Sequence, residues 1–176
     1  RLNRTQADYH AKKWYRNLIL KSRQLGFTTY ESVDSLDDTL FTPNTDALMI
    51  AHNLETGESI FTKKIAFAWE RLGEPIKQLF GVDNKTSKTL KFDWGAKGFS
   101  SIAVDTSGRS GTYQRLHITE LADISKKFPK KIPEIIEGTI PAIPTTGRID
   151  IESTSQGASG EFYEMFTEAW ERGEPT

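Results

Sequence analysis

The 176-residue chain carries 23 Lys and Arg against 24 Asp and Glu, and its formal net charge of −1 gives no global positive field that would favour nucleic-acid binding. The absence of cysteine excludes a disulfide framework and a thiolate metal site, and three histidines argue against a histidine-rich metal cluster. No apolar run is long enough to span a membrane and no signal-peptide pattern opens the chain, so we expect a cytosolic protein.

The predicted elements alternate between strands and helices. Short apolar or alternating runs predict strands over residues 17–22, 46–53, 89–95, 100–107, 115–122 and 148–155. Helices are predicted over residues 28–41, 55–72, 132–140 and 160–173. This alternation is typical of a three-layer α/β domain with a mainly parallel central sheet flanked by helices, and we expect residues 1–176 to form one such domain.

Two of the predicted helices are amphipathic. The helix over residues 28–41 is expected to turn three aspartates away from its apolar stripe: the aspartates are Asp34, Asp37 and Asp38, and the stripe is Tyr30, Val33, Leu36, Leu40 and Phe41. The last helix has an aromatic face formed by Phe162, Tyr163, Phe166, Ala169 and Trp170. We expect both apolar faces to pack against the sheet.

Residues 18–29, LILKSRQLGFTT, are similar to a phosphate-binding loop of the form G-x-x-x-x-G-K-[ST]. In such a loop a glycine such as Gly26 lets backbone N–H groups at a helix N-terminus approach a phosphate. Thr28 stands at the position that usually holds Mg²⁺. On this stretch alone, an ordinary strand-to-helix turn with an N-capping threonine is the simpler interpretation.

The loop lacks the lysine of that motif. Phe27 stands in its place, and Lys21 stands in the place of the first glycine. Arg23 lies near the start of the loop, and its guanidinium can bind phosphate oxygens through two parallel hydrogen bonds. We therefore expect Arg23 to supply the positive charge.

Two other predicted strands end in polar residues. The strand over residues 115–122 reaches Glu120, where a carboxylate could orient and deprotonate an attacking water. The last strand ends in Ser153 and Thr154, whose hydroxyls could sense a phosphate. Each feature alone is more simply a surface residue at the end of a strand. All three features nevertheless fall at the carboxyl ends of predicted strands, where α/β sheets bind ligands.

Together these stretches resemble the ATPase domain of the large terminase subunit, the motor of tailed double-stranded DNA viruses. KSRQLGFTT fits the deviant Walker A motif of this family, [K/x]-[S/A]-R-Q-x-G-[K/F/W]-[ST]-T, at every position. LHITE is similar to its acidic Walker B motif, and STSQG is similar to its S-T-x-x-G coupling motif. The resemblance runs in order from about Gln6 to the last predicted helix.

The resemblance implies a P-loop fold and an ATP hydrolase that uses Mg²⁺. Glu120 would be the catalytic carboxylate, and Thr28 would bind Mg²⁺. Thr119 stands where the family usually has an aspartate that supports the metal, so we include it as a metal-site residue. The nucleotide would contact Gln6 in an adenine-recognising segment, the loop residues Ser22, Arg23, Gln24, Leu25, Gly26, Phe27, Thr28 and Thr29, and the coupling residues Ser153 and Thr154.

The resemblance also implies assembly and partners. Arg109 is the candidate arginine finger that would reach a neighbouring subunit of a homo-oligomeric ring, with Arg115 and Arg148 as weaker candidates. The partners would be double-stranded DNA, the portal protein and the small terminase subunit, on a procapsid in the host cytoplasm, and no membrane. The nuclease domain of large terminases is not expected within residues 1–176. The alternatives are another DNA-dependent P-loop translocase and a degenerate, non-hydrolysing nucleotide-binding assembly module.

Overall fold

The computed structural model describes residues 1–108 and 111–173, and these residues form a seven-stranded sheet in the order β1-β7-β6-β2-β5-β4-β3. The neighbouring strands from β1 to β5 in this order are parallel to one another. They are β1 (Arg16–Leu20), β7 (Arg148–Ser153), β6 (Arg115–Thr119), β2 (Asp46–Ile50) and β5 (Phe99–Asp105). At one edge, β4 (Thr89–Asp93) and β3 (Gly81–Lys85) extend the sheet in antiparallel fashion.

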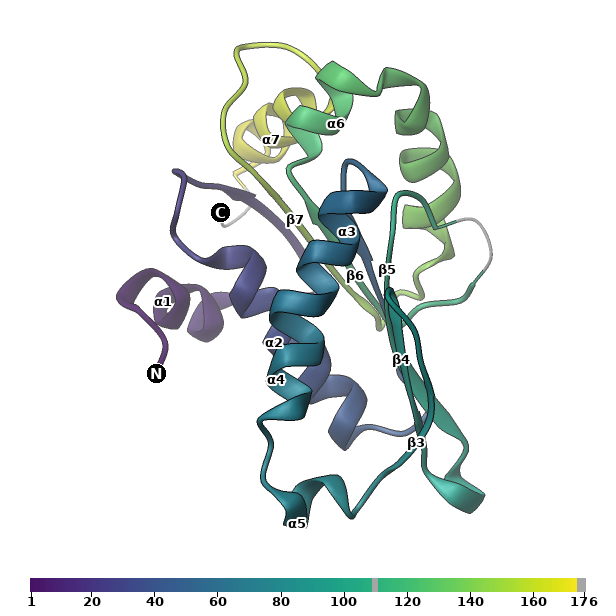
Figure 1. Cartoon of the computed structure of the whole chain (residues 1–176). Coiled ribbons are helices and arrows are strands. Elements are labelled where there is room, and N and C mark those ends of the chain that lie inside the picture. The colour runs from purple at the N-terminus through teal and green to yellow at the C-terminus, as the bar shows by residue number, and fades with distance from the viewer. Residues whose placement is uncertain (109–110, 174–176) are drawn as a thin grey trace.

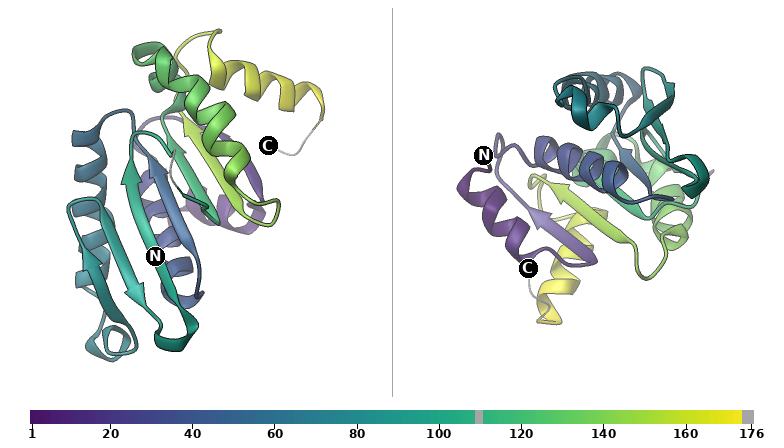
Figure 2. Two further views of the ribbon diagram at one scale, coloured as in Figure 1. Left: turned by 90° about the vertical axis from the view of Figure 1, so that its right-hand side faces the viewer. Right: turned by 90° about the horizontal axis from the view of Figure 1, so that it is seen from below.

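Helices cover both faces of the sheet, as Figures 1 and 2 show. One face is covered by α2 (Phe27–Phe41) and by a helical run made of α3 (Leu54–Ile60), the π-helical segment η1 (Phe61–Ala66) and α4 (Phe67–Glu70). The other face carries α6 (Leu121–Lys127), the π-helical segment η4 (Glu134–Thr139) and α7 (Glu161–Glu171). The remaining elements are α1 (Arg4–Lys12), α5 (Glu74–Lys77) and the 3₁₀ turns η2 (Gly95–Lys97), η3 (Pro129–Lys131) and η5 (Ile140–Ala142).

The central strand β2 separates two hydrophobic cores. Successive side chains of a strand point to opposite faces of its sheet. Ala47 and Met49 pack into the core under α2, α3 and α4, whereas Leu48 and Ile50 pack into the core under α6, η4 and α7. The predicted three-layer α/β fold with a mainly parallel sheet is therefore confirmed.

The structure differs from the sequence predictions in several elements. The polar strand β3 and the short helices α1, α5 and α6 were not predicted, because none has a long apolar pattern. Two residues of the expected stripe on α2 are exposed, Val33 at 46% and Phe41 at 55%. On α7, Tyr163 and Trp170 are likewise exposed.

Among the described residues, no helix combines the length and the apolar character needed to cross a membrane.

Candidate functional site

The stretch between β1 and α2 forms a tight loop that ends on Gly26. Gln24 and Gly26 both have a left-handed backbone, with φ values of 65° and 73°. Gly26 is the N-cap of α2 and has no side chain to cap the helix, so the first N–H groups of a 15-residue helix have no side-chain partner there. Backbone N–H groups and the helix dipole together attract an anion at such an end.

Helix α1 holds this loop from the side. The Gln6 side-chain amide donates to the carbonyl of Gly26 at 3.0 Å, and the Asn3 amide donates to the carbonyl of Leu25 at 3.0 Å. A β-carbon on Gly26 would lie 2.8 Å from Gln6 Nε2, so the Gln6 amide would have to shift to accommodate any other residue. The structure thus places Gln6 against the loop, and its role toward adenine stays a prediction.

Phe27, which replaces the lysine of the usual motif, points into the protein. Its side chain is 4% exposed, and its ring packs edge-on against Tyr9 with the centroids 5.5 Å apart. A lysine here would bury its ammonium group among aromatic rings. The structure therefore explains why this loop carries its positive charge elsewhere.

The cation that lies in the site is Lys21. Its Nζ lies 2.8 Å from Glu120 Oε1 and 3.6 Å from Glu152 Oε2, and its side chain is 8% exposed. Backbone hydrogen bonds to β7 set this arrangement, because the N–H of Lys21 donates to the carbonyl of Ser153 and the N–H of Glu120 donates to that of Glu152. Sequence reasoning identified Lys21 only as the residue in place of a glycine.

Arg23, the cation that the sequence favoured, is exposed and makes no hydrogen bond or ion pair with the described residues. Ser22 and Gln24 are exposed as well, and Leu25 is partly buried. The role of Arg23 toward phosphate stays a prediction. Arg109 lies outside the described residues.

Both oxygens of Glu120 are engaged. Oε1 accepts from Lys21, and Oε2 accepts from the backbone N–H and the hydroxyl of Thr154, each at 3.1 Å. Glu120 has a left-handed backbone, with a φ of 56°, and it caps α6. A non-glycine residue is strained there, and such strain is often kept at functional sites. The predicted catalytic carboxylate and the predicted coupling residue are therefore in direct contact.

The hydroxyls of Thr28 and Thr119 meet at one buried carboxylate that the sequence analysis did not assign to the site. Both donate to Oε1 of Glu152, at 2.8 Å and 3.0 Å. Burial opposes the ionisation of Glu152. Three neighbours outweigh burial and lower the pKa of Glu152 to about 2: His117, whose Nε2 lies 3.3 Å from Oε1, Lys21 and the Thr28 hydroxyl. Glu152 is therefore a negative charge at neutral pH.

Ser153 faces the opposite side of β7. Its hydroxyl accepts from the N–H of Ala122 at 3.1 Å and donates to the carbonyl of Thr154 at 3.0 Å. The side chain is fully buried. Ser153 therefore ties β7 to the start of α6, whereas Thr154 contacts Glu120.

A second ammonium group faces the first turn of α2. Lys64 on η1 donates to the hydroxyl of Thr29 at 2.8 Å. Burial lowers the pKa of Lys64, although the negative charge of Glu152 acts in the opposite direction. Together with Lys63, it lines a surface pocket of about 540 Å³ beside Thr29. Lys64 appeared in the sequence only as part of a helical pattern, because its partner comes from another helix.

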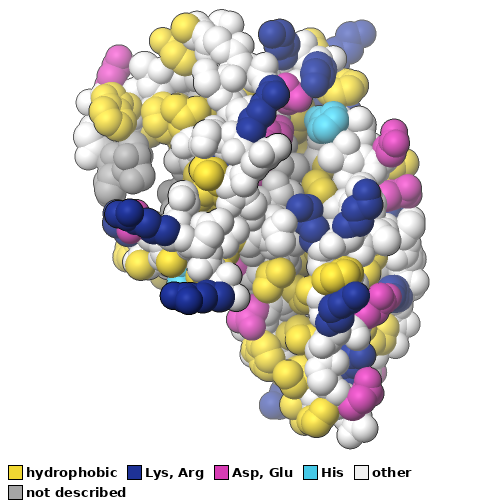
Figure 3. Space-filling view, turned by 60° about the vertical axis from the view of Figure 1, so that its left-hand side comes forward, with side chains coloured by type: hydrophobic (Ala, Val, Ile, Leu, Met, Phe, Trp, Pro, Cys, Tyr) yellow, Lys and Arg dark blue, Asp and Glu magenta, His cyan; other side chains and the backbone are white. Residues whose placement is uncertain are grey.

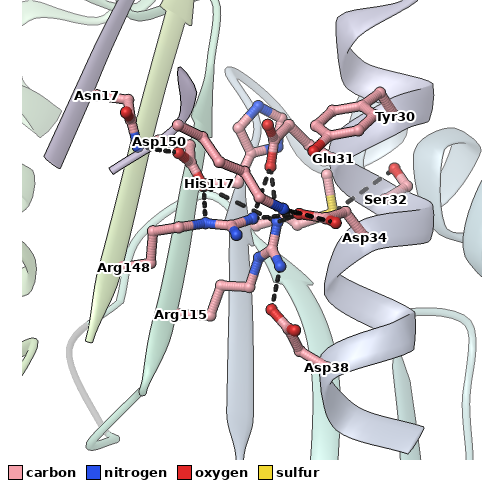
Figure 4. Close-up of polar contacts among 12 residues, drawn as sticks. Asn17, Tyr30, Glu31, Ser32, Asp34, Asp38, Arg115, His117, Arg148 and Asp150 are labelled. Atoms are coloured by element: carbon pink, nitrogen blue, oxygen red, sulfur yellow. Dashed lines mark hydrogen bonds and ion pairs between the residues drawn. The ribbon is translucent and has the colours of Figure 1, made fainter. Parts of the chain in front are cut away.

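Beneath the site, α2 faces β6 and β7 through a buried network of charges, drawn in Figure 4. Arg115 is 2% exposed and pairs with Glu31 at 2.8 Å, with Asp34 at 2.6 Å and with Asp38. Arg148 also pairs with Asp34. Asp34 and Asp38 lie off the apolar stripe as expected, but this face of α2 is not simply solvated, because it packs on arginines of the sheet.

The same network overturns the two weaker arginine-finger candidates. An arginine finger must reach an adjacent subunit, but Arg115 is buried and the side chain of Arg148 is only 17% exposed. Arg148 donates through Nε to Asp150 at 2.8 Å, and Asp150 also accepts from Asn17 at 2.7 Å and from the Tyr9 hydroxyl. These arginines therefore bind carboxylates of the same chain.

A larger pocket, of about 660 Å³, lies between α7 and the segment over residues 155–159 that follows β7. It is lined by the aromatic side chains of α7, by Leu20 and by residues that follow β7, and none of its lining side chains is charged. Phosphates need cations or N–H groups that converge on them. The loop after β1 is therefore the better phosphate site.

No family model matches the sequence, and no curated protein matches it. The structure is similar to two solved structures of the large terminase ATPase domain of Thermus phage P74-26, one of them a mutant. The mutant has a TM-score of 0.75 at 22% identity over 94% of this chain and 70% of that one, and the other has a TM-score of 0.72 at 21% identity over 94% and 69%. The crystal structure of the HK97 bacteriophage large terminase has a TM-score of 0.70 at 12% identity over 99% of this chain and 38% of that one. The chain therefore has the fold of the ATPase domain of phage large terminases.

Proposed function

We propose that residues 1–176 form an ATP-hydrolysing domain of a viral motor that drives double-stranded DNA into a procapsid. One observation carries this proposal. The phosphate loop after β1, Glu120 after β6 and Thr154 after β7 meet at the carboxyl ends of three neighbouring parallel strands. Ligands of open α/β sheets bind at this edge. The likeness to terminase ATPase domains supports the same proposal at the level of the fold.

The phosphates of ATP would bind at the start of α2. The uncapped N–H groups that follow Gly26 provide donors, and Lys21 provides the cation that Phe27 does not. Charged hydrogen bonds of this kind contribute more than neutral ones. We infer that Lys21 rather than Arg23 is the principal phosphate-binding cation.

The threonines of the loop and of β6 fit a divalent cation. Mg²⁺ bound with ATP would neutralise charge on the phosphates during phosphoryl transfer. The hydroxyls of Thr28 and Thr119 lie on one carboxylate oxygen, which gathers the oxygen ligands that Mg²⁺ prefers. These two residues would therefore help to hold the ion.

Glu120 would orient the attacking water and accept its proton. Its Oε1 now accepts from Lys21, so the carboxylate must exchange this partner before it can accept from water. Phosphates that attract the Lys21 ammonium would free Oε1. Thr154 would stay on Oε2 and carry the state of the site to the coupling segment.

The parts of the motor beyond this domain follow from the family resemblance. The partners we propose are double-stranded DNA, the portal protein and the small terminase subunit, with several copies of this chain in a ring on the procapsid in the host cytoplasm. On the face drawn in Figure 3, lysines and arginines are spread among acidic and apolar side chains. The densest basic run in the sequence is KKFPKK, residues 126–131. The side chains of Lys126, Lys127 and Lys130 in this run are exposed.

Phosphate release from ATP tests the enzymatic proposal. With Mg²⁺ and double-stranded DNA present, Glu120→Gln is expected to lower turnover by about 10²–10⁴-fold while ADP still binds. Lys21→Met is expected to weaken ADP binding by about 10- to 100-fold, the value of a charged hydrogen bond. Glu168→Gln, at an exposed position on α7, is the matched control and should leave both measurements unchanged.

One observation favours a second candidate, a nucleotide-binding module that does not hydrolyse ATP. Glu120 is bound on both oxygens, as a purely structural carboxylate would be. In that case the parent would bind ADP but release phosphate no faster than Glu120→Gln, with or without DNA. That result would refute hydrolysis and keep nucleotide binding.

A further inference from the structure

Glu152 is a fully buried carboxylate that retains unused hydrogen-bonding capacity. Oε1 accepts from the hydroxyls of Thr28 and Thr119, but Oε2 accepts no hydrogen bond from any described residue. The nearest cation to Oε2 is the Lys21 ammonium, at 3.6 Å. A buried ionised oxygen without donors is costly, so such an atom suggests a missing partner.

The position of Glu152 in the sheet gives that partner a chemistry. Thr119 on β6 and Glu152 on β7 are register partners in the parallel ladder. Thr119 directly precedes Glu120, at the place where P-loop ATPases carry the aspartate that supports Mg²⁺. Glu152 therefore brings a carboxylate to the neighbouring position, one strand away.

Thr28 provides a second, independent pointer. It is the first hydroxyl after the loop glycine, and in P-loop enzymes the hydroxyl at this position and the acidic residue of the neighbouring strand share one metal ion. In this chain the Thr28 hydroxyl donates directly to Glu152. The hydroxyl and the carboxylate that would share the ion are thus already in contact.

We propose that Glu152 supplies the carboxylate that holds the Mg²⁺ of the bound nucleotide, in place of the aspartate that Thr119 replaces. The proposal rests on the proposed nucleotide site and names one more residue of it. Mg²⁺ is commonly bound by one or two carboxylates together with substrate phosphates. The described part of the chain has no group of three or more His, Cys, Asp or Glu side chains placed to hold a metal ion by themselves.

The competing role for Glu152 is that of a counterion. His117 and Lys21 both lie against it, at 3.3 Å and 3.6 Å, and a carboxylate that only neutralises them would have no effect specific to the metal. Its removal would then change stability, or nucleotide affinity, by the same factor with and without Mg²⁺. The two roles therefore differ in one measurable ratio.

That ratio is the Mg²⁺ enhancement, the affinity for ADP in excess Mg²⁺ divided by the affinity in excess chelator, measured by calorimetry. We expect Glu152→Gln to lower the enhancement at least about tenfold, as loss of a supporting metal ligand does, with little change in metal-free affinity. The double variant Glu152→Gln with Thr119→Asp moves the carboxylate to the usual strand and should restore most of the enhancement. With Mn²⁺ in place of Mg²⁺, electron paramagnetic resonance spectra of the ADP complexes should show the ion bound more tightly by the parent and by the double variant than by Glu152→Gln.

Glu31→Gln is the matched control. Glu31 is as buried as Glu152, but it pairs with Arg115 and Arg148 below the site. This variant is expected to lower the melting temperature and to leave the Mg²⁺ enhancement unchanged. It therefore separates general damage to the charge network from loss of a metal ligand.

The outcomes separate the two proposals. If the parent binds no ADP under either condition, the proposed function itself fails, and this inference fails with it. If the parent binds ADP but Glu152→Gln keeps the enhancement, or if the parent shows none, only the role of Glu152 is overturned. If Glu152→Gln does not fold, Glu152→Asp decides in its place, because it keeps a negative charge for His117 and Lys21 but withdraws the carboxylate by one methylene: a lowered enhancement supports the proposal and an unchanged enhancement overturns it.

Discussion

Replacement of Arg115 by methionine tests how much the buried charge network stabilises the fold. Methionine keeps most of the side-chain length but removes the guanidinium that pairs with Glu31, Asp34 and Asp38. Removing one partner of a buried ion pair costs about 3–5 kcal/mol, because the other charge stays buried without compensation. Arg148 still lies 3.6 Å from Glu31, so we expect the lower end, about 3 kcal/mol.

The assay is unfolding by denaturant and by heat. For a chain of this size, 1 kcal/mol shifts the melting temperature by about 2–4 °C, so the expected loss is about 6–12 °C. Lys12→Met is the matched control. It removes a cation from an exposed pair with Asp8 and should change the free energy of unfolding by less than about 0.5 kcal/mol.

The pH dependence of this loss tests the mechanism. Burial, and after it the charge of Asp150, raises the pKa of Glu31 well above its ordinary value. The folded state therefore binds a proton that the unfolded state releases, and stability falls as the pH rises from the unfolded pKa toward the folded one. Loss of the Arg115 guanidinium, which lies 2.8 Å from Glu31, removes a neighbouring positive charge and should raise the folded pKa of Glu31 further, so the deficit of the variant should shrink as the pH falls toward the unfolded pKa. A deficit below 1 kcal/mol, or one that is independent of pH, would refute this reasoning.

Three other substitutions, one of them with a matched control, test the frame of the loop by the same unfolding assay and by nucleotide binding or turnover. Gly26→Ala should lower the free energy of unfolding by at least about 1–2 kcal/mol, because alanine is strained at a φ of 73° and its β-carbon would lie 2.8 Å from Gln6 Nε2. Gly26→Ala should also weaken ADP binding. The control is Gly147→Ala, at a crowded glycine far from the loop, which should leave ADP binding unchanged. Tyr9→Phe removes the hydroxyl that donates to the buried Asp150 and should cost about 1–3 kcal/mol, and an unchanged midpoint would show that water replaces it. Phe27→Lys restores the usual motif in sequence but should destabilise the fold by about 3 kcal/mol or more without raising ATP turnover; higher turnover would contradict the inward position of this side chain.

The sequence was sufficient to predict the layers of the fold and to place the candidate site at the carboxyl ends of the parallel strands. Strand-forming runs are short and apolar, and their polar ends at Glu120 and Thr154 could be read as positions at one edge. The structure brings these two side chains together at 3.1 Å. The carboxyl ends of parallel strands must meet at one edge, so the prediction needed only the strand assignments.

The charged residues inside the protein could not be predicted in this way. Periodicity only places Asp34 off the apolar stripe of its helix, and an arginine in a strand has no pattern that reveals its partner. Two of the partners of Asp34, Arg115 and Arg148, lie more than 80 residues further along the chain. Lys21 and Glu152 were missed for the same reason, because their meaning depends on strands that become neighbours only in the folded sheet.

The face of β7 that points toward α2 unites these observations. Alternate residues of a strand share a face, so Asp150, Glu152 and, just after the strand, Thr154 lie in a row. Asp150 binds Tyr9 of the helix that holds the loop, Glu152 binds Thr28, and Thr154 binds Glu120. Each contact joins β7 to a different part of the candidate site, so a small shift of this one strand would reach the loop, the hydroxyl that we propose binds Mg²⁺ and the carboxylate that we propose is catalytic. We therefore propose that β7, which lies between β1 and β6, relays the state of the bound nucleotide through these direct contacts.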